Sequence, residues 1–163
     1  MADQSSYRAE VDRKRIEQIR EICRELPQCC GDFLSGIALT TGTFTRLAYA
    51  LDLRTFFNYL HAERVAFADT KPVLMTDRQI GSVTKADLTA YVEYLTYYFR
   101  EIGDDENTRV TETENHEKSI KRKLCALRSM YEYLFKNGRI ESNIMQLVDL
   151  PKIHEKPIIR LSP

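Results

Sequence analysis

The chain has 163 residues, of which 43% are hydrophobic and 29% are charged, a balance typical of one globular domain with a true core. Its 24 Lys and Arg residues match its 24 Asp and Glu residues, so net charge indicates no bulk attraction to nucleic acid. Six glycines and five prolines are too few for a sandwich or barrel rich in tight turns.

Hydrophobic periodicity predicts helices along most of the chain. Pro27 ends the first of them, and Asn137-Gly138 is a typical C-terminal stop for the long basic one. A Thr84-x-x-Asp87 pattern predicts a capping box, and Asn143 is expected to cap a last short helix. In chain order the predicted helices cover residues 10–26, 28–39, 43–65, 84–102, about 117–136 and 143–151.

The segments between these helices are expected to be loops. Residues 66–83 have mixed loop character, residues 103–115 are polar and acidic, and the tail 152–163 has no helical period. No run of alternating residues predicts a strand convincingly, so we expect an all-α bundle of four or five helices with an extra N-terminal helix.

The long basic helix is the most informative element. A stripe of apolar residues at helical spacing predicts its buried face: Ile120, Leu124, Leu127, Tyr131 and Leu134. Four cations stand in the two turns predicted to open the helix: Lys118, Lys121, Arg122 and Lys123. Cations are unfavourable near a helix N-terminus, where the macrodipole is positive, so this clustering favours an anion such as phosphate as a ligand. A solvated surface face is the alternative.

Three motifs resemble segments of one protein family. The pattern L-x-x-L-R-S-x-Y-x-Y-L over residues 124–134, with the Lys-Asn-Gly turn after it, resembles the last helices of the core-binding domain of tyrosine recombinases, the phage-integrase family. The patterns T-x-x-x-Y-x-x-x-L-x-x-F-x-x-x-L over 45–60 and V-T-x-x-D-L-x-x-Y-x-x-x-L over 83–95 resemble its early and middle helices. The resemblance covers residues 34–151.

The resemblance implies a SAM-like helical domain that binds double-stranded DNA. It divides the chain into an N-terminal arm (1–30), a core-binding domain (31–151) and a linker (152–163) to an absent catalytic domain. Contacts to phosphates, and to one base edge, are expected from the basic helix: Lys118, Ser119, Lys121, Arg122 and Lys123. Arg128 serves equally well as a salt-bridge residue.

The start of the helix over residues 43–65 is a second candidate for contact with the DNA backbone. Hydroxyls and free amides at a helix start are good phosphate donors, and helix capping is their alternative role. The residues concerned are Thr43, Thr45 and Arg46.

No catalytic set is expected in this chain. His61 and Arg64 form an H-x-x-R pair, which serves catalysis in the family, but the pair lies inside the early helix and is a chance match. Tyr49, Tyr91 and Tyr131 fall on core stripes, and no nucleophile stands beside a base.

Cofactors, metals and small-molecule substrates are likewise not expected. The four cysteines form no C-x-x-C pair, which argues against a disulfide framework or a zinc site. No apolar run is long enough to span a membrane, so we expect a cytoplasmic protein.

The sequence thus predicts a non-enzymatic DNA-binding domain that takes part in DNA integration and recombination beside other protomers of a synaptic complex. Two other interpretations stay open. One is a helical protein-interaction module whose basic face binds an acidic partner, and the other is an enzyme with unrecognised chemistry.

Overall fold

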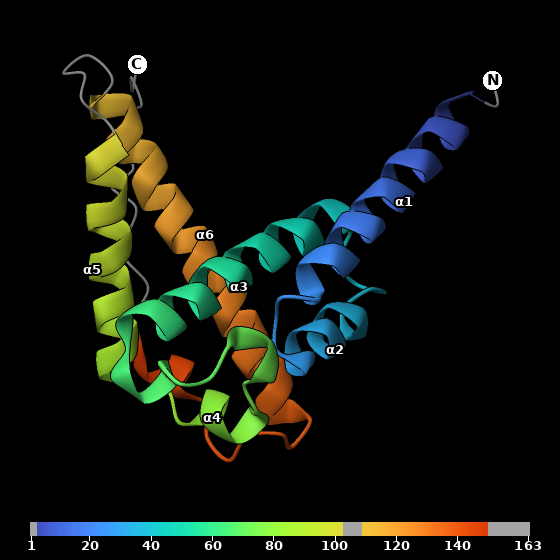
Figure 1. The fold of residues 1–163 in the computed structure, drawn as a ribbon. Helices are drawn as coiled ribbons and strands as arrows, with labels where there is room; N and C mark the ends of the chain where they lie inside the picture. The colour runs from blue at the N-terminus through green and yellow to red at the C-terminus, as the bar shows by residue number, and fades with distance from the viewer. Residues whose placement is uncertain (1–2, 103–108, 150–163) are drawn as a thin grey trace, which may run out of the picture.

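The computed structural model describes residues 3–102 and 109–149, and the side chains of residues 4–97 and 116–149. These described residues form helices and no strand, which confirms the all-α prediction (Figure 1). The α-helices are α1 (Asp3–Cys23), α2 (Gln28–Gly36), α3 (Thr43–Glu63), α4 (Asp77–Gly81), α5 (Lys85–Ile102) and α6 (Arg109–Lys136). Short 3₁₀ helices cover Val65–Phe67, Pro72–Leu74 and Ile144–Leu147.

Helix α3 lies at the centre of the bundle and contacts α1, α2, α5 and α6. In Figure 1, α5 and α6 run side by side in opposite directions. The N-terminal half of α1 projects from the bundle, and its C-terminal half lies beside α3 and runs in the same direction. The Thr43 hydroxyl of α3 donates to Asp12 of α1, and Arg54 further along α3 donates to Glu25, two residues after the end of α1. Because Ile19 of α1 belongs to the same buried core as α3, the C-terminal half of α1 is packed into the bundle.

The predicted buried stripe of α6 is confirmed in full. Its five residues expose at most 7% of their surface: Ile120, Leu124, Leu127, Tyr131 and Leu134. The hydroxyl of Tyr131 donates to the carbonyl of Ile80 at 2.7 Å, which satisfies its buried polar atom. Tyr91 of α5 is buried as predicted, and so are its neighbours Leu88 and Leu95 on the same helix face.

Several predicted caps are confirmed, but the first helix is misplaced at both ends: α1 begins at Asp3 rather than at residue 10, and it ends at Cys23, four residues before Pro27. The Thr84 hydroxyl accepts from the Asp87 amide at 3.2 Å, and the Asp87 carboxylate accepts from the Thr84 amide at 2.9 Å, so the capping box is complete. Gly138 has φ +68°, the left-handed conformation that ends α6. The Asn143 side chain accepts from the Met145 amide at 3.1 Å and caps a 3₁₀ turn.

Two predictions about loops are wrong. The sequence predicts an acidic loop over residues 109–115, but they are the first turns of α6, so this helix begins eight residues before residue 117. The remainder of that predicted loop, residues 103–108, and the predicted linker 152–163 lie outside the described residues. The segment 66–83 contains α4, whose own capping box joins Thr76 and Gln79.

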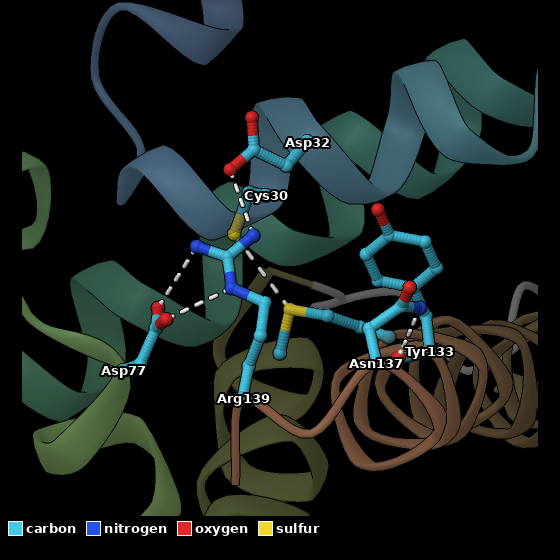
Figure 2. Close-up of polar contacts among 7 residues, drawn as sticks. Cys30, Asp32, Asp77, Tyr133, Asn137 and Arg139 are labelled. Atoms are coloured by element: carbon cyan, nitrogen blue, oxygen red, sulfur yellow. Dashed lines mark hydrogen bonds and ion pairs between the residues drawn. The ribbon is translucent and has the colours of Figure 1, made fainter.

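Arg139 ties the end of α6 to two other helices (Figure 2). Its guanidinium donates to Asp32 of α2 at 2.7 Å and to Asp77 of α4 at 2.8 and 3.3 Å. The buried Cys30 thiol lies nearby, 3.7 Å from the Met130 sulfur, and burial raises its pKa well above the ordinary value. These contacts therefore hold α2 and α4 against the C-terminal end of α6.

Candidate nucleic-acid interface

The four predicted phosphate-binding cations lie in the middle of α6. Lys118 is the tenth residue of the helix, because α6 begins at Arg109. The macrodipole acts within the first and last turns only, so it neither penalises these cations nor attracts an anion to them. The dipole argument drawn from the sequence is therefore wrong, and the cations must be explained by what they contact.

Two of these cations neutralise one buried carboxylate. Asp52 of α3 has a side chain with 0% exposure, and both of its oxygens accept from Arg122, from Nε at 3.1 Å and from Nη2 at 3.0 Å. Lys123 Nζ donates to the same carboxylate at 2.9 Å. Side-chain exposure is 54% for Arg122 and 11% for Lys123. We call these three residues the Asp52 cluster, and it carries one net positive charge.

The other two of the four predicted cations, Lys118 and Lys121, have no ion-pair partner among the described residues. Lys118 is exposed and Lys121 is half-buried. At 100° per residue, Lys118, Lys121 and Arg122 lie within an arc of about 100°, with Lys118 and Arg122 opposite the buried stripe and Lys121 on its flank. We call these three residues the cationic arc. Ser119 is half-buried beside it.

Arg128 is exposed but separate from the cationic arc. It lies about 9 Å further along the helix axis than Arg122, on the flank of Lys121. There it lines a hollow with Glu132, Phe135 and Gln146. No salt bridge to Arg128 is found among the described residues, so its predicted structural role gains no support.

The start of α3 is held differently from what the sequence predicts. The Thr43 side chain is buried, and its hydroxyl donates to Asp12 of α1 at 2.6 Å, so it neither caps the helix nor faces solvent. Arg46 folds back, and its Nε donates to the Thr41 carbonyl at 3.1 Å. Only Thr45 of the three is exposed without such a contact in the described part of the chain. It precedes Asp52 by seven residues, two helical turns, so both lie on one face of α3.

Sequence reasoning missed Asp52, although a signal was present. Asp52 follows Tyr49 by three residues and precedes Phe56 by four, which places a carboxylate on the buried stripe of α3. A buried carboxylate requires a cation, and the basic segment of α6 was the obvious source.

Both residues of the rejected H-x-x-R pair have structural partners. His61 Nδ1 lies 3.1 Å from the Phe67 carbonyl, and Arg64 Nε donates to Asp87 at 2.6 Å. Burial raises the pKa of the Tyr91 and Tyr131 hydroxyls, which disfavours their ionised forms. Within the described residues, no three His, Cys, Asp or Glu side chains gather as metal ligands, and no helix is long and apolar enough to cross a membrane.

The geometry thus defines a helical bundle with a cationic arc backed by a buried carboxylate. Comparison with known proteins finds one distant similarity. No family model and no solved structure matches the chain. Over 119 residues the chain is 29% identical to the tyrosine recombinase XerC of Caldanaerobacter subterraneus subsp. tengcongensis, a match that covers 71% of this chain and 31% of that protein. The similarity supports a relation to tyrosine recombinases, as the motifs predicted.

Proposed function

We propose that this chain is the N-terminal core-binding domain of a tyrosine-type site-specific recombinase and binds double-stranded DNA during DNA integration and recombination. The observation that carries this proposal is the cationic arc. Three cations share one side of α6 while the opposite side is buried, so the arc can approach a duplex without disturbing the core. The match to a tyrosine recombinase is the second support.

Exposure and ion pairing support a narrower set of proposed DNA contacts than the sequence alone. Lys118, Lys121 and Arg122 are the principal phosphate contacts, and Ser119 and Thr45 are candidate hydroxyl donors beside them. Lys123 is 11% exposed and bound to Asp52, so it neutralises the buried carboxylate and does not contact DNA directly. Arg128 would reach a more distant phosphate. Strand cleavage and contacts with other protomers would then belong to the assembled recombinase.

Fluorescence anisotropy with a labelled duplex tests the proposal. At about 50 mM salt we expect micromolar or weaker binding that falls steeply as salt increases, because contacts to phosphates release counterions. The variant Lys118→Glu/Lys121→Glu should lose this binding and keep its helical circular-dichroism spectrum.

The matched control is Lys71→Glu/Lys85→Glu. It changes the net charge equally, but both lysines are exposed on other elements: Lys71 directly precedes the 3₁₀ helix Pro72–Leu74, and Lys85 is the first residue of α5. Equal losses for the two variants would mean that binding depends on net charge alone. No binding of the unmodified chain to any duplex at tens of micromolar would refute the DNA-binding function and favour an acidic protein partner.

A further inference from the structure

The contact between Arg122 and Asp52 uses only one edge of the guanidinium. Nε and Nη2 each donate to one carboxylate oxygen, which is the side-on bidentate geometry of an arginine–carboxylate pair. A guanidinium has five N–H groups, so three of them, both on Nη1 and the second on Nη2, remain for another acceptor. The Arg122 side chain is 54% exposed, and its Nη1 makes no hydrogen bond among the described residues, so the outer edge has no protein acceptor there.

The carboxylate itself lies in a closed environment. Asp52 has 0% side-chain exposure, and its negative charge is the second cause, after burial, of the raised pKa of the neighbouring Tyr91 hydroxyl. A carboxylate so enclosed has little freedom to move, and it therefore fixes the orientation of whatever it binds. Lys123 supplies the compensating charge, so Arg122 is held without its positive charge being cancelled.

We propose that Asp52 is a positioning residue for DNA binding, which holds the Arg122 guanidinium so that its outer edge donates to a backbone phosphate. The inference rests on the proposed DNA-binding function. An exposed arginine loses rotamer freedom when it binds a phosphate, and an arginine already fixed by Asp52 loses less. The carboxylate thus increases affinity for a polyanion although it has the same sign of charge.

The variant Asp52→Asn tests this directly, because the two explanations predict opposite changes in DNA affinity. Simple electrostatics predicts tighter DNA binding, because a negative charge is removed near the interface. Positioning predicts weaker binding, by roughly tenfold, the value of one charge-assisted hydrogen bond. It also predicts a smaller slope of log K against log salt, by about 0.9 for one lost phosphate contact. Glu132→Gln removes an exposed carboxylate from the same helix and is the control, which should bind as well as the unmodified chain or slightly better.

A second variant decides the question if Asp52→Asn fails to fold. Arg122→Lys keeps the charge on a half-exposed side chain but cannot bind Asp52 through one edge and a phosphate through the other. Positioning predicts a similar loss of roughly tenfold in affinity. In a folded Arg122→Lys background, Asp52→Asn should add no further loss, whereas a merely structural role for Asp52 would give additive losses.

The outcomes separate this inference from the function on which it rests. Unchanged binding of Arg122→Lys, or tighter binding of Asp52→Asn, by an otherwise DNA-binding chain overturns the positioning role alone. Failure of the unmodified chain to bind any duplex overturns both.

Discussion

Removing the cations of the Asp52 cluster tests whether the cluster holds α6 against α3. The variant Lys123→Met keeps the apolar stem of the side chain but deletes the donor that lies 2.9 Å from the buried carboxylate. We expect the free energy of unfolding to fall by about 1.5–3 kcal/mol, the value of a hydrogen bond to a charged group. Adding Arg122→Met leaves Asp52 with neither of its cations, and the total loss should reach about 3–5 kcal/mol.

Urea denaturation followed by circular dichroism measures both losses. Lys121→Met is the control, because Lys121 has no salt bridge among the described residues and its loss should change stability by less than about 0.5 kcal/mol. A loss of 3–5 kcal/mol is a large part of the roughly 5–15 kcal/mol that stabilises a typical domain, so the double variant should be visibly less folded at 37 °C. Equal stability of Lys123→Met and Lys121→Met would show that the carboxylate does not need both cations.

Three further predictions concern the core, alkaline pH and catalysis. Leu134→Ala should lower the free energy of unfolding by about 2–5 kcal/mol, because its side chain is fully buried, and an unchanged urea midpoint would contradict the packing of α6. Burial raises the pKa of Cys30 above its ordinary 9.0, so its stabilising contribution is complete below pH 9 and is lost as pH rises through the folded-state pKa. Urea melts under reducing conditions between pH 7 and 10.5 should show this decline, and Cys30→Ala should flatten it. The chain should leave supercoiled plasmid intact and form no covalent adduct on a denaturing gel, and an adduct abolished by a single Tyr→Phe change would refute this.

The sequence predicts most of the helices because helical periodicity and capping depend on residues close together in the chain. The stripe from Ile120 to Leu134 and the Thr84–Asp87 capping box depend on residues a few positions apart, and the structure confirms both. The start of α6 was misplaced because its first turns are polar, so no apolar period marks them. Once the buried stripe has formed the helix, extending it toward the N-terminus adds one hydrogen bond per residue and needs no further apolar residues.

The site was less predictable because it depends on contacts between distant residues. Arg122 and Asp52 are 70 positions apart, and Thr43 and Asp12 are 31 apart. A helical wheel correctly places Arg122 away from the buried stripe, but it cannot show that a neighbouring helix supplies a carboxylate there. Thr43 illustrates the reverse case, because a residue typical of a helix start is enclosed by α1.

The free energy of unfolding alone does not require a charged cluster in the core. A buried ion pair replaced by apolar residues of similar size is often neutral or stabilising by about 1–4 kcal/mol, because desolvating the charges costs more than their attraction returns. Asp52→Leu combined with Lys123→Met removes the two most buried charges of the Asp52 cluster, leaves Arg122 in place and does not alter the net charge. If the cluster exists to hold Arg122 for DNA, this variant should melt at the same or a higher temperature and yet bind a duplex roughly tenfold more weakly. Differential scanning calorimetry and fluorescence anisotropy on the same preparation measure the two properties. A variant that binds DNA as tightly as the unmodified chain would refute the positioning role, and one that loses several kcal/mol would show that the cluster is retained for stability instead.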